Sequence, residues 1–152
     1  MSGRKITIPN DILIEEVADR LNAGQEVILL TRGYSMTPFL RNDKDSVLLY
    51  RKEPAVDDIA LARIHYSNGG NRETMYVLHR IIAIDGDVVT LMGDGNIRGQ
   101  ERCRKGDVLG CVKEIIRPDG SHVVPGNGRL WRRLLPIRRY LLFIYRRLPG
   151  KK

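Results

Sequence analysis

The sequence predicts a mostly β domain (β-rich α+β) with one N-terminal helix and a basic, helical C-terminal tail. Six short apolar segments, rich in β-branched residues and separated by Gly, Asn and Asp, have the composition of strands. Ahead of residue 118, helical periodicity is evident over residues 11–23. A length of 152 residues and a hydrophobic content of 42% suit one domain with one core.

The N-terminal helix is predicted over about residues 11–23. Asn10 and Asp11 follow Pro9 and can cap the first turn, while Gly24 is placed to end the helix. One face is apolar and is expected to pack on the body, through Leu13, Ile14, Val17, Ala18 and Leu21.

The strands follow in close succession, joined by turns. Ser67–Asn71 has the composition of a turn or short loop, and Asp85-Gly86 is a strong hairpin signal. Gly110 inside the last strand indicates a bulge or bend. The predicted strands are Glu26–Thr31, Asp45–Tyr50, Ile59–Tyr66, Thr74–Ile84, Val88–Met92 and Asp107–Ile116.

Composition divides the chain into a body (1–117), a Pro- and Gly-rich linker (118–128) and a basic amphipathic tail (129–152). The tail has nine Lys or Arg and no Asp or Glu, so the +8 net charge less this +9 leaves −1 on residues 1–128. The excess of positive charge therefore belongs to the tail, and it favours an anionic partner.

Arginine pairs alternate with Trp, Tyr, Phe and Leu along the tail, and Pro136 should kink or restart its helix. Six arginines between Leu130 and Leu148 are too many for a membrane-spanning segment. The pattern favours peripheral membrane contact or docking on a partner through residues 129–148. Packing on the body, disorder and nucleic-acid binding are the alternatives, nucleic acid being the least favoured.

The cysteines and the apolar segments of the sequence argue against a zinc site, a secretory signal and a membrane-spanning helix. Cys103 and Cys111 have only His122 nearby, which is too few ligands for zinc, and two free thiols are expected. The sequence shows no secretory signal peptide and no run of about 18 apolar residues. We expect a cytoplasmic protein or one on the cytoplasmic face of a membrane, without a cofactor.

Ser35 is the candidate nucleophile. It lies in Gly33-Tyr34-Ser35-Met36-Thr37-Pro38, where Gly33 and Pro38 favour a tight turn that would present the hydroxyl outward. Backbone N–H groups of such a turn can stabilise an oxyanion. A Gly-x-Ser turn alone is weak evidence, because a serine in a loop is usually only polar surface.

A serine needs a base, and His79 is the first candidate. It lies within an apolar strand, where a histidine is unusual for packing alone, although a hydrogen-bonded core histidine is the alternative. His65 ranks lower because its strand has polar neighbours, and His122 ranks lower because it lies in the linker. Asp94 follows the return strand of the His79 hairpin and could orient the base, or it could simply form a turn.

Six blocks in fixed order resemble the signal peptidase I superfamily, which also contains the LexA-like SOS-repressor autoproteases. The resemblance covers about residues 25–117, and the nucleophile of its Ser-Met-x-Pro motif corresponds to Ser35. The blocks are Gly33-x-Ser35-Met36-x-Pro38, Asp45-Ser-Val-Leu-Leu, Asp58-Ile-Ala-Leu, Val77-Leu-His79-Arg80-Ile81, Gly93-Asp94-Gly-Asn96 and Leu109-Gly110-Cys-Val112.

The resemblance implies a Ser35–His79 dyad, because His79 aligns with the family's lysine base and is similar to the histidine of the endoplasmic-reticulum and archaeal enzymes. Those enzymes carry a further acid just beyond the Gly-Asp-Asn block, so the third residue is Asp94 or Glu101. The turn residues Gly33, Ser35, Met36 and Pro38 would form the oxyanion site. Tyr34 departs from the small residue usual before the serine, and no membrane anchor is evident.

The resemblance therefore predicts a serine endopeptidase that acts on a peptide or protein through an acyl-enzyme. A non-enzymatic peptide- or partner-binding module on the same fold is one alternative. An SOS-repressor-like autoprotease is another, although the stretch before Ser35 is short for a DNA-binding domain and a linker.

Overall fold

The computed structural model describes residues 6–7 and 11–149, and the strands of this part form one nine-stranded sheet. The strand order is β1-β2-β3-β8-β4-β5-β6-β7, with β9 added to β8; β1 is parallel to β2 and the other pairs are antiparallel. The strands are β1 (Ile6–Thr7), β2 (Val27–Leu30), β3 (Ser46–Tyr50), β4 (Ile59–Asn68), β5 (Asn71–Asp85), β6 (Val88–Met92), β7 (Glu101–Arg104), β8 (Val108–Ile116) and β9 (His122–Val123).

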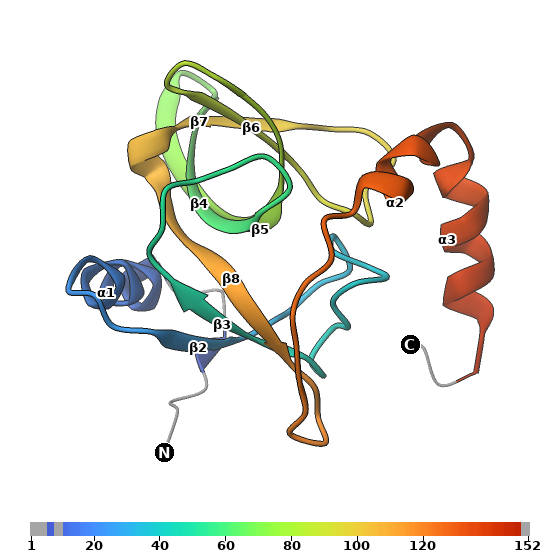
Figure 1. Cartoon of the computed structure of the whole chain (residues 1–152). Helices are drawn as coiled ribbons and strands as arrows, with labels where there is room; N and C mark the ends of the chain where they lie inside the picture. Colours follow the sequence, from blue (N-terminus) through green and yellow to red (C-terminus); the bar gives the residue numbers. More distant parts are fainter. Residues whose placement is uncertain (1–5, 8–10, 150–152) are drawn as a thin grey trace.

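Helices lie at both ends of the described chain, which confirms the predicted class of mostly β with an N-terminal and a C-terminal helix. Figure 1 shows α1 on one side of the molecule and α2 and α3 on the opposite side, with the strands between them. The helices are α1 (Asp11–Asn22), α2 (Arg129–Arg133) and α3 (Arg138–Arg147), with 3₁₀ turns η1 (Lys105–Asp107) and η2 (Leu135–Ile137).

Helix α1 matches the predicted helix and ends as its sequence predicts. Gly24 has φ +81°, a conformation that suits glycine, and its N–H donates to Leu21 O. The proposed cap at Asn10 lies outside the described residues. The apolar face is buried in the core through Ile14, Val17, Ala18 and Leu21.

The hairpin of β4 and β5 is longer than predicted. Pairing runs from Ile59 opposite Arg80 to Asn68 opposite Asn71, so the turn is only Gly69-Gly70. Both glycines have positive φ, which allows a two-residue turn. The second hairpin turns at Gly86 (φ +57°), as the Asp85-Gly86 pair predicts.

The core has two apolar clusters, and β4 contributes to both. Ile59 and Leu61 face the cluster that also contains α1, whereas Ala60, Ala62 and Ile64 face the cluster between β4, β6 and β8. Successive side chains of a strand point to opposite faces, so burial on both faces makes the start of β4 continuously apolar.

Gly110 in β8 lies beside an irregularity, as its position in the strand predicts. The register of β4 and β8 shifts between Leu61 and Ala62, which pair with Gly110 and Val108. A Cβ at Gly110 would lie 2.9 Å from Leu21 Cδ1 and 3.1 Å from Tyr50 O, so α1 and β3 approach this backbone closely.

Strand β7 is absent from the sequence prediction. Its four residues, Glu101–Arg104, carry three charged side chains, so the strand has no apolar alternation that would identify it. Glu101 and Cys103 are the partly buried residues of the strand, and Cys103 packs against the second cluster. Cys103 and Cys111 are free thiols, as predicted.

The C-terminal segment folds back onto the body. Within the predicted linker, strand β9 pairs with β8. In the tail, the 3₁₀ turn η2 contains Pro136 and separates α2 from α3, as predicted for that proline. We call residues 129–149 the arm. Among the described residues no helix is long and apolar enough to cross a membrane.

Candidate active site

Ser35 lies in the turn that follows β2. Gly33 has φ +88°. Its N–H donates to Asn42 Oδ1 at 2.7 Å, and this hydrogen bond joins the start of the loop between β2 and β3 to a later part of the same loop. Thr37 N–H donates to Tyr34 O at 3.1 Å, which closes the backbone around Ser35. The Met36 side chain is buried and anchors the turn in the core.

The groups that a nucleophile turn needs are free at Ser35. The side chain is partly exposed, and within the described part of the chain neither its hydroxyl nor its N–H forms a hydrogen bond. A free N–H beside the hydroxyl can donate to an oxyanion. The Tyr34 side chain is 52% exposed, and the peptide bond before Pro38 is cis.

The turn Gly93–Asn96 packs directly on the Ser35 turn. Gly95 N–H donates to Ser35 O at 2.7 Å, and Asp94 N–H donates to Met36 Sδ at 3.4 Å. A Cβ at Gly93 would lie 2.4 Å from Ser35 O, and one at Gly95 would lie 2.2 Å from Tyr34 O. The two glycines are therefore required because two backbones touch here.

Glu101, and not Asp94, is the acid that the structure brings to His79. His79 Nδ1 lies 2.9 Å from Glu101 Oε2, and the two side chains are only 7% and 17% exposed. Glu101 is the first residue of β7, which pairs with β6, the neighbour of β5. With Nδ1 donating to the carboxylate, the imidazole leaves Nε2 as an acceptor.

Asp94 instead pairs with Arg80, so its predicted role as the orienting acid is not supported by the contacts. Arg80 donates to both Asp94 oxygens, with Nη2 to Oδ2 at 2.7 Å, and the two side chains are 1% and 3% exposed. Arg80 and His79 are consecutive in β5 and point to opposite faces. The same strand thus presents His79 to Glu101 and Arg80 to the turn behind Ser35.

Ser35 and His79 line the same cavity, which has a volume of about 190 Å³. Its walls come from the loop after β2 and from β5, and its apolar lining includes Met36, Leu40 and Leu78. Within the described residues no hydrogen bond joins Ser35 Oγ to the His79 ring. Such bonds often form only when substrate is bound.

The arm holds the Gly93–Asn96 turn from the other side. Trp131 Nε1 donates to Asp94 O at 2.6 Å, and Arg138 Nη1 donates to Asn96 O at 3.0 Å. Trp131 also meets Phe39 edge to face, with ring centroids 6.4 Å apart. The C-terminal segment is therefore part of the support behind the candidate nucleophile.

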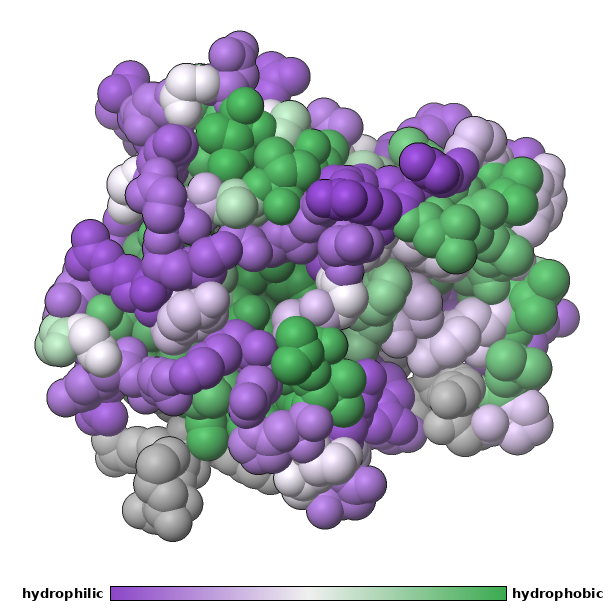
Figure 2. Space-filling model, viewed as in Figure 1, coloured by the Kyte–Doolittle hydropathy of each residue, from purple (hydrophilic) through white to green (hydrophobic). Residues whose placement is uncertain are grey.

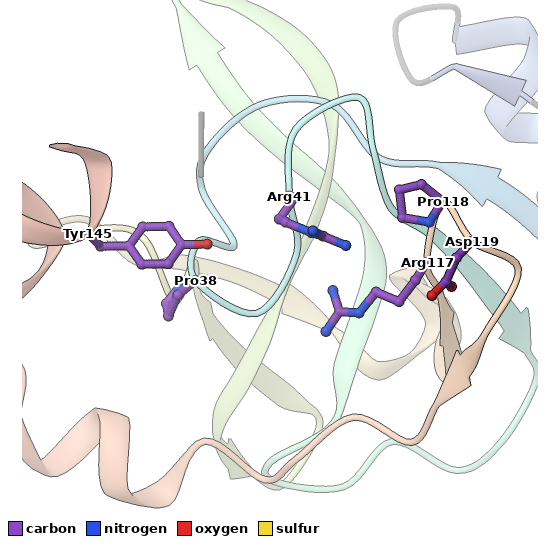
Figure 3. Close-up of a pocket in the computed structure, with 6 residues that line it drawn as sticks. All are labelled: Pro38, Arg41, Arg117, Pro118, Asp119 and Tyr145. Carbon is purple, nitrogen blue, oxygen red and sulfur yellow. The ribbon is translucent and has the colours of Figure 1, made fainter. Parts of the chain in front are cut away.

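A second, wider cavity of about 490 Å³ lies between the Ser35 loop, the end of β8 and α3. Figure 3 shows Arg41 and Arg117 in it, with the Tyr145 side chain extending from α3. Both arginines bind Asp45, which is fully buried, at 3.0 and 2.6 Å. They neutralise a core carboxylate and so serve the fold of the loop.

The other candidate groups lie apart from this site. His65 contacts Thr74 and Asp107, and His122 lies 2.6 Å from Glu114. The described residues contain no group of three or more His, Cys, Asp or Glu that could hold a metal ion. Local sequence patterns do not identify the structural contributions of Arg80, Asn42 and Trp131; the one signal is an arginine, Arg80, within an apolar strand.

Comparisons with models of known protein families, with curated proteins and with solved structures gave no match.

Proposed function

We propose that the chain is a serine endopeptidase that cleaves a peptide or protein substrate, with Ser35 as nucleophile, His79 as base and Glu101 as the acid that orients the base. The observation that carries the proposal is the 2.9 Å contact of His79 with Glu101 beside a cavity that Ser35 also lines. The six ordered sequence blocks that resemble signal peptidase I support the same assignment.

We propose that these groups act in the following order. Ser35 Oγ forms a bond to the scissile carbonyl carbon while its proton passes to His79 Nε2. The negative charge on the carbonyl oxygen is stabilised by the Ser35 N–H. His79 then gives the proton to the leaving amine as the C–N bond breaks. Water attacks the acyl-enzyme, and its proton returns through His79 to Ser35 Oγ as the ester breaks.

Glu101 accepts a hydrogen bond from His79 Nδ1 throughout, which fixes the tautomer and stabilises the imidazolium that forms. The Arg80–Asp94 pair and the Gly93–Asn96 turn contribute indirectly, because they hold the backbone of the Ser35 turn. No step requires a metal or an organic cofactor. We propose that the protein acts in the cytoplasm or at the cytoplasmic face of a membrane.

The test uses a peptide library read by mass spectrometry, together with labelling by a fluorophosphonate probe. Ser35→Ala and His79→Ala should abolish cleavage, and Ser35→Ala should abolish labelling, with the circular dichroism spectrum unchanged. Ser67→Ala and His65→Ala are the matched controls, because both residues are exposed on β4. Cleavage that survives in Ser35→Ala would rule out the proposal.

A further inference from the structure

The outer face of the arm is apolar and faces solvent. Phe143 and Ile144 of α3 are 56% and 58% exposed, and Leu130 of α2 is 72% exposed. The inner face is occupied, since Leu142 and Arg138 are 1% and 2% exposed. Figure 2 shows hydrophobic side chains gathered over α3. Further exposed apolar residues of the same segment are Leu135, Ile137, Tyr140 and Leu148.

Arginines surround this outer face, and they differ from the arginines that hold the arm in place. Arg129 and Arg132 are used internally, because both bind Asp57. Among the described residues, the exposed arginines of the arm without an acidic partner are Arg133, Arg139, Arg146 and Arg147, and residues 129–149 contain no Asp or Glu. Residues 1–128 carry a net charge of about −1, so the arm is the cationic part of the molecule.

Two of these arginines stack on the exposed rings. Arg139 lies over Tyr140 at 4.7 Å from the ring centroid, and Arg147 lies over Phe143 at 4.0 Å. Each pair places a guanidinium, which can contact a phosphate, next to an apolar ring. A phospholipid presents the matching groups, because its anionic phosphate can pair with the guanidinium and its apolar acyl chain can pack against the ring.

We propose that the outer face of the arm binds the surface of an anionic lipid bilayer, with α3 lying in the plane of the interface. Helix α3 has ten residues and is about 15 Å long, half the thickness of the hydrocarbon core. It can bury Phe143 and Ile144 at the level of the acyl chains while its arginines meet phosphates. This proposal does not depend on peptidase activity.

Two other occupants fit the same face less well. A second copy of the chain, packed through this face, would bring two sets of exposed arginines together without acidic partners. Nucleic-acid bases would need free ring faces to stack on, whereas one face of Tyr140 and one of Phe143 already carry a guanidinium. Charge and apolar area together therefore favour anionic lipid.

The experiment is co-sedimentation of the full chain with phosphatidylcholine vesicles that contain or lack phosphatidylglycerol. We expect binding to the anionic vesicles, with little to the neutral ones, and weaker binding as salt rises. Arg139→Gln, Arg146→Gln and Arg147→Gln together should lower the partition coefficient by about fivefold per arginine. Phe143→Ser with Ile144→Ser should also lower it strongly.

Matched controls test whether the position of these residues matters. Arg72→Gln, Arg98→Gln and Arg102→Gln remove three exposed arginines of the body, and Val56→Ser with Val124→Ser removes two exposed apolar side chains. Both should bind vesicles like the parent chain, as should Ser35→Ala. Trp131 emission reports whether the arm of each variant stays docked.

Equal binding by the parent chain and the arm variants would overturn the proposal, as would equal binding to neutral and anionic vesicles. Binding of a single-stranded oligonucleotide without binding of vesicles would assign the face to nucleic acid. A concentration-dependent dimer that Phe143→Ser with Ile144→Ser abolishes, again without vesicle binding, would assign it to self-association.

Discussion

Two neighbouring side chains of β5 have different tasks because they point to opposite faces of the strand. His79 meets Glu101 beside an open cavity, whereas Arg80 meets Asp94 in the interior, where both side chains are at most 3% exposed. A carboxylate beside a cavity can assist chemistry, while a buried ion pair mainly decides whether the surrounding backbone keeps its position. The two acids should therefore give different phenotypes when altered.

Glu101→Gln should lower kcat by about 10²- to 10⁴-fold and leave the thermal midpoint nearly unchanged, because it removes the charge that orients His79. Asp94→Asn should cost about 3–5 kcal/mol of stability, since it leaves Arg80 buried without its partner. Peptide cleavage and urea unfolding of both variants measure this contrast. The assignment fails if Asp94→Asn is as stable as the parent chain while Glu101→Gln remains fully active.

The two thiols should be poorly reactive in the folded protein. Burial, with a smaller contribution from nearby aspartates, raises the pKa of Cys103 to about 11 and that of Cys111 to about 12. Only the thiolate reacts, so at pH 8 about one Cys103 in a thousand is in the reactive form. We expect slow reaction with a thiol reagent in buffer and rapid reaction in denaturant. Fast labelling of Cys111 in the native state would contradict this.

At this scale the sequence could locate Ser35 and His79, since a turn with Gly and Pro and a histidine in an apolar strand are local signals. It left Asp94 and Glu101 as alternatives, because the partner of a side chain depends on strand pairing that local patterns do not encode. Glu101 belongs to β7, whose composition of Glu, Arg, Cys and Arg has no apolar period.

At the scale of elements, two turns that are far apart in sequence interlock behind the candidate nucleophile. Gly95 is the closest point, with its backbone against Tyr34 O and Ser35 O. Each turn has backbone hydrogen bonds of its own, such as Thr37 N–H to Tyr34 O and Asn96 N–H to Gly93 O, and the Gly95 N–H to Ser35 O bond joins the two. The Gly-Asp-Gly-Asn sequence is thus explained by the space available.

Gly95→Ala should displace the Ser35 turn, because the new Cβ would lie 2.2 Å from Tyr34 O. We expect a loss of about 1–3 kcal/mol in unfolding free energy and a larger proportional loss of peptide cleavage. Gly106→Ala is the matched control, since nothing lies within 4 Å of its Cβ position, and it should change stability by less than about 0.5 kcal/mol. Equal effects of the two substitutions would contradict the interlocking of the turns.

Most elements could be predicted from local patterns: α1 from its helical period, β6 with the same bounds, and the hairpin turn at Gly86. Segment 118–128 has the composition of a linker, yet it contains β9 and carries Gly126, whose carbonyl accepts from Arg80 Nη1 at 2.6 Å. Gly and Pro indicate irregular backbone, and they do not indicate whether that backbone is held by the rest of the fold.

On the scale of the whole molecule, the arm joins the C-terminal end of the described chain to the site through its inner face while its outer face remains free. Arg138 is buried with its Nε lacking a partner among the described residues, and desolvation lowers its pKa. Such a cost is tolerated because Trp131, Leu142 and the Asp57 contacts hold the same segment. The docked state of the arm therefore depends on a small number of charged contacts, and it should respond to pH.

Asp57 is the titratable group that pairs with Arg129 and Arg132 of the arm, so its pKa predicts how docking of the arm depends on pH. Burial alone would raise its pKa, but hydrogen bonds from Arg129 and Arg132 outweigh burial and lower the pKa below the ordinary 3.8. A carboxylate with a lowered pKa stabilises the fold at pH values above about 4, and this contribution is lost as the pH falls through the lower, folded value. We expect Trp131, the single tryptophan, to shift its emission to the red as the pH falls from about 5 to 2.

Asp57→Asn should abolish much of this acid dependence, because the variant lacks the titrating partner of Arg129 and Arg132. Its emission should already be red-shifted at neutral pH, and its thermal midpoint should be lower there by a few degrees. Asp19→Asn, at an exposed position of α1, is the control and should titrate like the parent chain. If Asp57→Asn and the parent chain show the same emission at every pH, the arm is held by its apolar contacts, and the charged contacts with Asp57 add little to docking.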